Sequence, residues 1–279
     1  MNNRLTTFTG KNPAPKMYAI TSGKGGVGKS VIAFNLACHL AQSHRVLLVD
    51  GDFYMGSLPV LANAAPEYGL KQVCRGELDL HHAVIRLANG LDLLASNGNN
   101  WEEALPDVKS LAHLLAALQT VPTAYDYVII DTASPILPQT SLILHAVDEI
   151  ILVTTPELTA ITDCYALYKV LSTHQPGLIA SLIINGEDRQ DEIEYIYEKF
   201  VAMTSQFLGH SPAFLGRLAH DRALVDAVAR QQGVMQFAPD STINRQFAEL
   251  ANILTGRRQP VIHRENTVNF TAVKADIKE

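Results

Sequence analysis

Glycine and lysine are concentrated in one short stretch of the chain, TSGKGGVGKS at positions 21–30. From Gly23 to Ser30 it matches the pattern G-x-x-x-x-G-K-[ST], whose glycines let the backbone turn tightly and bring N–H groups against phosphate oxygens. In this pattern Lys29 reaches the β- and γ-phosphates, and the Ser30 hydroxyl ligates Mg²⁺. The stretch therefore predicts a site for a nucleoside triphosphate with Mg²⁺.

The sequence on either side of this loop fits the same interpretation. An apolar run, MYAIT at 17–21, precedes the loop, and a segment with helical spacing, VIAFNLACHLAQ at 31–42, follows it. A phosphate-binding loop requires this order of strand, glycine-rich loop and helix. We expect the nucleotide to contact the loop through Gly23, Lys24, Gly25, Gly26, Val27, Gly28, Lys29, Ser30 and Val31.

Three aspartates stand where apolar runs end. Asp50 and Asp52 follow RVLLV at 45–49, and Asp131 ends YDYVIID at 125–131. Ligands in open α/β sheets bind at the carboxyl ends of the strands, so acids there are well placed to face the phosphate-binding loop. A single strand-ending aspartate is often only a turn or cap residue. The three acids together with the loop favour one shared site.

The generic loop pattern does not require Lys24. With this additional lysine, G-K-G-G-V-G-K-S resembles the deviant Walker A motif of the MinD/ParA ATPases. The resemblance covers about 16–254 and implies a P-loop NTPase fold and an ATP-dependent homodimer, in which Lys24 reaches the nucleotide held by the partner subunit. A second cation there would neutralise charge that develops on the transferred phosphoryl group. The alternative interpretation of Lys24 is a solvated loop charge.

The same resemblance implies a role for each acid. Asp131 matches the Walker B carboxylate, which holds Mg²⁺ through water, and Asp50 would help to position the Mg²⁺ shell. Asp52 matches the second acid of the family's D-x-D motif and would orient the attacking water. Lys24, Lys29 and Asp52 are thus the expected catalytic residues, with Ser30, Asp50 and Asp131 at the metal.

Two positions depart from the family pattern. A glycine usually stands two residues after the second Asp, but Asp52-Phe53-Tyr54-Met55-Gly56 places Tyr54 there. The Walker B segment usually continues D-T-x-x-G, and Pro135 occupies the position of that glycine. Proline has no N–H, so it cannot reproduce a contact between that amide and the γ-phosphate. We therefore expect ATP binding with slow hydrolysis that a partner stimulates.

Two further segments resemble the family's base pocket. Asn185 ends LIASLIIN at 178–185, where relatives use an Asn whose amide pairs with both a donor and an acceptor on adenine. The stretch GRLAHDRAL at 216–224 resembles the family's G-x-I-P-x-D segment, with Ala219 in place of the proline and Asp221 as the acid. An ordinary loop is nearly as good an interpretation of this stretch.

The segment TPELTAITDCYALYKVL at 155–171 indicates the subfamily. It resembles the P-E-x-T-A-I-T-D-x-Y-A-L-x-K stretch of FlhG/FleN, MinD-like ATPases that control flagellar number and placement. Helix capping by Thr159 or Thr162, and packing by its apolar residues, are the alternative interpretations. The resemblance implies a regulator of flagella whose protein partner is a flagellar regulator or assembly factor.

The elements that must position these residues follow from the apolar pattern. Short β-branched runs alternate with longer segments of helical spacing, and the runs lie at 17–21, 45–50, 91–95, 125–131, 149–155 and 178–185. Strands that are apolar on both faces are typical of a parallel sheet covered on both sides. We expect an α/β fold with a mostly parallel sheet and helices on both faces, in one domain at 16–254.

Cysteine content, apolar segments and net charge indicate the cellular compartment and the class of partner. The three cysteines, Cys38, Cys74 and Cys164, form no C-x-x-C pair, which favours buried free thiols in a reducing compartment. No signal peptide is evident, and no segment has about 18 uninterrupted apolar residues, so we expect a cytoplasmic protein. The net charge of −6 argues against direct binding to DNA.

The two ends differ from the rest of the chain. Residues 1–15 indicate a flexible leader, and 255–279 form a polar tail in which Phe270, Val273 and Ile277 have the spacing of a short amphipathic helix. Membrane-surface helices usually have larger apolar faces and more Lys and Arg. Peripheral contact with the inner face of the membrane is therefore a weaker expectation than disorder or docking on the ATPase.

Two alternatives to a flagellar regulator remain open from the sequence. A MinD-type division-site ATPase or a ParA-type DNA or cargo-partitioning ATPase would share the same motifs, and a DNA-partitioning dimer should show a basic surface with salt-sensitive binding. A metabolic P-loop enzyme, such as an ATP-dependent ligase, would consume ATP in proportion to a small-molecule product. An iron–sulfur reductase is disfavoured, because the cysteines lack a cluster-ligand pattern.

Overall fold

A computed structural model describes residues 14–54, 56–96, 105–119, 125–134 and 137–256. Residues 1–13 of the expected leader, Met55, Pro135 and residues 257–279 of the expected tail lie outside these ranges. Within the described ranges, regular structure begins at Lys16 and ends at Leu254. No helix within the described ranges is long and apolar enough to cross a membrane.

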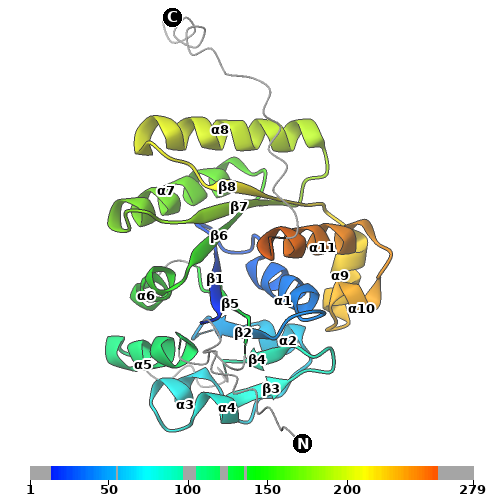
Figure 1. Cartoon of the computed structure of the whole chain (residues 1–279). Coiled ribbons are helices and arrows are strands. Elements are labelled where there is room, and N and C mark those ends of the chain that lie inside the picture. The colour runs from blue at the N-terminus through cyan, green and yellow to red at the C-terminus, as the bar shows by residue number, and fades with distance from the viewer. Residues whose placement is uncertain (1–13, 55, 97–104, 120–124, 135–136, 257–279) are drawn as a thin grey trace, which may run out of the picture.

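The centre of the molecule is an eight-stranded sheet in the order β3-β4-β2-β5-β1-β6-β7-β8 (Figure 1). All neighbouring strands are parallel except β3 and β4, which are antiparallel at one edge. The strands are β1 (Lys16–Thr21), β2 (Val46–Gly51), β3 (Val84–Arg86), β4 (Asp92–Leu94), β5 (Tyr127–Thr132), β6 (Glu149–Thr154), β7 (Ala180–Asn185) and β8 (Ala213–Leu218).

Helices cover both faces of this sheet, as Figure 1 shows. α1, α2, α9, α10 and α11 share one apolar core with the sheet, and α3, α5, α6, α7 and α8 share the other. The helices are α1 (Lys29–Leu40), α2 (Leu58–Leu61), α3 (Leu70–Cys74), α4 (Leu80–Ala83), α5 (Val108–Gln119), α6 (Pro138–Ala146), α7 (Leu158–His174), α8 (Gln190–Leu208), α9 (Arg222–Ala229), α10 (Val234–Phe237) and α11 (Thr242–Leu254).

The apolar runs of the sequence are strands because their side chains enter a core on each face. In β1, Met17 and Ala19 belong to one core, whereas Tyr18 and Ile20 belong to the other. Alternate residues of a strand point to opposite faces, so an apolar run without alternation fits a sheet covered twice. The predicted α/β architecture is therefore confirmed, and the three cysteines are free and buried as expected.

The apolar pattern of the sequence does not predict two of the strands. β3 has only three residues at the antiparallel edge of the sheet. β8 includes Gly216 and Arg217, so its pattern is weaker than that of the central strands, and it forms only when β7 provides a partner. The interpretation of 216–224 as an ordinary loop was therefore wrong, because its first residues complete β8 and its last three begin α9.

Candidate functional site

The phosphate-binding loop joins β1 to α1, and its last glycine marks the start of the helix. Gly28 has φ 93°, a left-handed conformation that glycine adopts without strain, and it is the N-cap of α1. The first N–H groups of α1 have no partner within the helix, so they are available to an anion. Val27 is buried in the core beneath the loop, and Val31 is partly buried beside it. The loop is thus anchored from below by its own apolar residue.

Asn185 reaches this loop from the end of β7. Its Nδ2 donates a hydrogen bond to the Val27 carbonyl oxygen at 2.8 Å. A Cβ atom at position 28 would lie 2.6 Å from the same Nδ2, so only glycine allows this close approach. The structure places Asn185 against the loop, as a base-reading residue requires. Its role toward adenine stays a prediction.

The three aspartates meet at the carboxyl ends of two adjacent strands. β2 pairs with β5 in a register that sets Asp50 directly beside Asp131, and β5 is also the neighbour of β1, which leads into the loop. Both of these carboxyl groups are buried. Asp52 lies just beyond β2, is partly buried, and accepts a hydrogen bond from the Tyr54 amide at 3.0 Å. The expected gathering of acids next to the loop is therefore present.

Burial changes the acidity of the groups at this site. It lowers the pKa of Lys29, and the charges of Asp131 and Asp52 counteract that effect. Burial raises the pKa of Asp131 to about 6, although the Ser30 hydroxyl and the Lys29 ammonium both act to lower it. The pKa of Asp50 is raised by burial first and then by the charges of Asp131 and Asp52. Three carboxyl groups beside one lysine leave an excess of negative charge that a cation would relieve.

The residues present fit a hard divalent cation. Asp131 Oδ1 is buried and has no hydrogen-bond partner among the described residues. Leaving a buried acceptor unsatisfied is unfavourable, and such an atom is explained when a bound ion or water satisfies it. The Ser30 hydroxyl beside it adds a second oxygen. Mg²⁺ prefers a few oxygen ligands together with water and phosphate, which is what this donor set offers.

Lys24 contacts a distant part of the same chain. Its Nζ donates hydrogen bonds to Glu157 Oε2 at 2.5 Å and to Thr159 Oγ1 at 3.0 Å. Glu157 is the N-cap residue of α7, and both partners belong to the segment at 155–171. The pair is accessible, since the Lys24 side chain is 36% exposed and that of Glu157 is 66% exposed. Lys24 is thus a partnered residue at the rim of the site and not a solvated loop charge.

The loop also touches α7 through its first glycine. A Cβ atom at Gly23 would lie 2.2 Å from the Asp163 carbonyl carbon and oxygen and 2.7 Å from the Cys164 nitrogen. The backbone of the loop and that of α7 are therefore packed together with no space for a side chain between them. Any displacement of the loop at this point must be accommodated by α7.

Serines that the sequence analysis did not select also connect these segments. Ser134 Oγ donates to the Ser22 carbonyl oxygen at 3.0 Å, and Ser22 Oγ donates to the Lys24 carbonyl oxygen at 2.6 Å. Ser96 Oγ donates to Asp50 Oδ2 at 3.5 Å. Ser134 could have been found from the sequence, because it lies three residues after Asp131 in D-T-A-S. No pattern near Ser96 in the sequence indicates that it lies beside Asp50.

Other expected features have structural explanations. Asp221 is the N-cap of α9, and its carboxylate accepts from the Ala223 amide at 2.8 Å and the Ile243 amide at 3.3 Å, so it holds α9 and α11 in place. Neither Thr159 nor Thr162 caps α7, because the helix begins one residue after Glu157. The packing interpretation of this segment was correct in part, since Leu167 and Tyr168 are buried.

A parallel α/β sheet, a glycine loop at the N-terminus of a buried helix and aspartates at adjacent strand ends define a P-loop nucleoside triphosphatase. The AAA domain family model AAA_31 matches residues 15–184. The chain belongs to this family and is a MinD/ParA-type P-loop ATPase.

Individual relatives agree with this class. Antiactivator FleN from Pseudomonas aeruginosa is 29% identical over 238 residues, which cover 85% of each chain. Flagellum site-determining protein YlxH from Helicobacter pylori is 29% identical over 246 residues, 87% of this chain and 82% of that protein. The solved structure of septum site-determining protein MinD from Pyrococcus horikoshii, complexed with Mg-ADP, matches with a TM-score of 0.72 at 24% identity, over 94% of this chain and 100% of that chain.

Proposed function

We propose that the protein is an ATP-operated dimerisation switch that regulates the number or placement of flagella. Its similarity to FleN and to the flagellum site-determining protein YlxH over most of the chain supports the flagellar part. The switch part is supported by the contacts between the nucleotide site and α7, the segment that indicated this subfamily. In this proposal the nucleotide state of the loop controls the surface that α7 offers to a partner.

The observation that carries the proposal is the double contact of the loop with α7. Lys24 is bonded to Glu157 and Thr159 at the start of α7, while Gly23 is packed on its backbone one turn later, at Asp163. A loop that binds phosphate cannot move at these two points without changing its contacts with α7. Nucleotide binding and the position of α7 are therefore expected to be coupled.

Each residue of the site has a chemical task in this proposal. The N–H groups of the loop and Lys29 hold the phosphates, and Asn185 reads the adenine edge. Ser30 and Asp131, with Asp50 beside them, would hold Mg²⁺, which would supply charge neutralisation to the phosphates. Asp52 orients the attacking water. Lys24 leaves Glu157 and contacts the nucleotide of a second subunit, where it stabilises charge that develops on the transferred group.

Slow basal hydrolysis follows from the same arrangement. In the single chain Lys24 is held by Glu157 and Thr159, so it must exchange these partners before it can act in a dimer. A second subunit, and a protein partner that binds near α7, would both favour that exchange. The exposed start of α7 offers such a surface, because the Leu158 side chain is 79% exposed beside Glu157.

The first test compares the wild type with Lys24→Ala in Mg-ADP and in Mg-ATP. Solution mass and hydrolysis are measured in the same samples, with Lys199→Ala as the control, because Lys199 lies on α8 and stacks on Tyr195. We expect wild type and control to be monomers with ADP and dimers with ATP, and turnover to be lost in Lys24→Ala. An oligomeric state that ignores the nucleotide, or full activity of Lys24→Ala, would reject the switch and favour a metabolic P-loop enzyme.

The flagellar part has a separate test in the source cell. Replacing the chromosomal gene by a Lys29→Ala allele should change the number or position of flagella counted by electron microscopy. Normal flagella in a strain whose chromosome distribution or septum position is disturbed would instead favour a partitioning or division-site role.

A further inference from the structure

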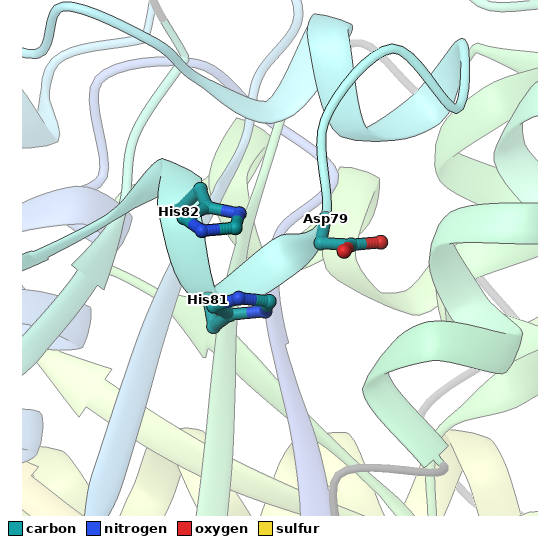
Figure 2. Close-up of side chains that lie close together, drawn as sticks. All are labelled: Asp79, His81 and His82. Atoms are coloured by element: carbon teal, nitrogen blue, oxygen red, sulfur yellow. The ribbon is translucent and has the colours of Figure 1, made fainter.

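A cluster of metal-ligating side chains lies outside the nucleotide site, in the connection between α3 and β3. Asp79 precedes α4, and His81 and His82 lie on it. One ligand atom of each residue lies within 4.8 Å of the others, and all three side chains are exposed. Figure 2 shows the two imidazole rings one above the other, with the Asp79 carboxylate beside them. None of these residues belongs to the set expected to hold ATP or Mg²⁺.

The two imidazole rings are in contact. Their centroids are 3.8 Å apart and their planes are tilted by 41°. A neutral imidazole offers one nitrogen lone pair in the plane of its ring, so a metal ion would be bound at the ring edges. The arrangement therefore brings two metal-ligating side chains to the same place.

Asp79 is not used for the structural task that its position suggests. It is the N-cap residue of α4, yet its carboxylate accepts no hydrogen bond from the helix. Within the described ranges, no hydrogen bond or ion pair engages the side chain of Asp79, His81 or His82. Three metal-ligating groups that converge in this way, with no hydrogen-bond or ion-pair partner in the described part of the chain, are not explained by the packing of this turn.

A cavity beside Asp79 has no cationic lysine or arginine among its described lining residues. Asp79 lines a cavity between α3, α4 and α5 that His113 also lines. Neither lysine nor arginine occurs among the described residues that line this cavity. Within this cavity, no described side chain therefore offers the Asp79 carboxylate an ammonium or guanidinium group.

We propose that Asp79, His81 and His82 form a binding site for a divalent transition-metal ion of the Zn²⁺ type. Two imidazoles and one carboxylate are the ligands that Zn²⁺ takes, with water in the fourth position. Mg²⁺ prefers oxygen ligands in octahedral geometry, so this site and the nucleotide site select different ions. Tetrahedral ligands about 2 Å from the metal are closer together than 4.8 Å, so small rotations of exposed side chains close the site.

The test titrates the full-length, metal-stripped protein with Zn²⁺ alone in excess Mg²⁺ and without nucleotide. A chromophoric chelator reports free Zn²⁺, so affinity and stoichiometry are measured without reference to ATPase activity. The variants are Asp79→Asn and the double variant His81→Gln/His82→Gln. The control is His145→Gln/His174→Gln, which removes two exposed histidines bonded to backbone carbonyls in α6 and α7. The three cysteines are buried and do not offer a competing surface site.

We expect one saturable Zn²⁺ site in the wild type and in the control. Loss of an outer-shell partner alone weakens metal binding by about 10- to 100-fold, so loss of both histidine ligands should weaken it by at least that factor. Asp79→Asn should weaken it in the same direction. Unchanged affinity in His81→Gln/His82→Gln, or no saturable binding to the wild type, would overturn the proposal. Circular dichroism melts establish that all variants are folded.

Discussion

The nucleotide site contains two lysines in opposite situations. On its floor, defined as Lys29 with Asp50 and Asp131, the lysine is only 8% exposed and faces buried carboxyl groups. On its rim, defined as Lys24 with Glu157 and Thr159, the lysine is accessible and bonded to the start of α7. The two lysines are five positions apart in one loop. Their environments therefore differ because of what the tertiary structure places beside each.

This difference separates a fixed region from an exchangeable one. Buried charges are costly to leave unpaired, so the floor keeps its geometry whether or not a ligand is bound. An accessible ion pair contributes about 0–1 kcal/mol, so the rim can exchange partners at little cost. We infer that the floor binds the nucleotide phosphates and that the rim exchanges its contacts when the nucleotide state changes. The following variants test this distinction.

Removing the positive charge of Lys29 from the floor should have the largest effect, and that effect is on turnover. Lys29→Met keeps the aliphatic stem but cannot contact phosphate, and we expect turnover to fall by about 10³-fold, as for the loss of a strong transition-state donor. The variant should also lose some stability, because it leaves the buried Asp131 carboxyl group without the Lys29 charge beside it, so circular dichroism must establish that it is folded. Single-turnover hydrolysis and binding of a fluorescent ATP analogue measure the effect. Lys16→Met, at an accessible ion pair with Glu149, is the matched control and should be unaffected.

The Asp131 carboxylate of the floor should lower the free energy of unfolding of the nucleotide-free protein at neutral pH. The pKa of Asp131 rises from 3.8 to about 6 on folding, so the folded state holds this proton more tightly than the unfolded state. Its contribution to the free energy of unfolding therefore falls as pH rises from about 4 to about 6, and the full cost is present above that window.

Asp131→Asn removes this titration. At 1.36 kcal/mol per pKa unit, we expect the variant to be more stable at pH 7.5 by up to about 3 kcal/mol, with a smaller difference at pH 5. Urea denaturation at both pH values measures it. Mg-ATP should then stabilise the wild type but not the variant. Equal stability at pH 7.5 would show that Asp131 is not an uncompensated charge.

The contact between the loop and α7 should have an intermediate effect. Gly23→Ala places a methyl group against the Asp163 backbone, and overpacking of this kind costs about 1–3 kcal/mol. Gly25→Ala is the control, because a Cβ there has nothing within 4 Å, and its stability should stay within about 0.5 kcal/mol of the wild type. Thermal unfolding compares the two. Similar melting temperatures would mean that α7 yields easily and that the coupling is weak.

Breaking the ion pair of the rim should have the smallest effect on stability. Glu157→Gln keeps the shape of the side chain and leaves Thr159 as a partner of Lys24. We therefore expect the free energy of unfolding to fall by less than about 1 kcal/mol, and by less still at high salt. Urea denaturation at two salt concentrations is the measurement. A larger loss would mean that the rim is as fixed as the floor and that Lys24 does not exchange partners easily.

Much of the floor could be predicted from the sequence because its chemistry is local. Gly23 to Ser30 is a continuous motif, and aspartates at the ends of β-branched runs must lie at the same edge of a parallel sheet. Neither the partners of Lys24 nor the cluster at Asp79 could be read in this way. Lys24 and Glu157 are 133 positions apart, and the convergence of Asp79 with His81 and His82 depends on the turn into α4.

The sequence by itself determined the class of the protein, because the loop motif and the alternation of apolar strands with helices are imposed by short-range sterics and by burial on both faces of a sheet. The tertiary structure decided which groups share an environment. The register between β2 and β5 brings Asp50 beside Asp131, and β7 gives β8 the partner that makes it a strand. It also decided that Lys29 is buried while Lys24 is not. Such contacts join residues far apart in the chain, and only the folded state defines the distances on which their energies depend.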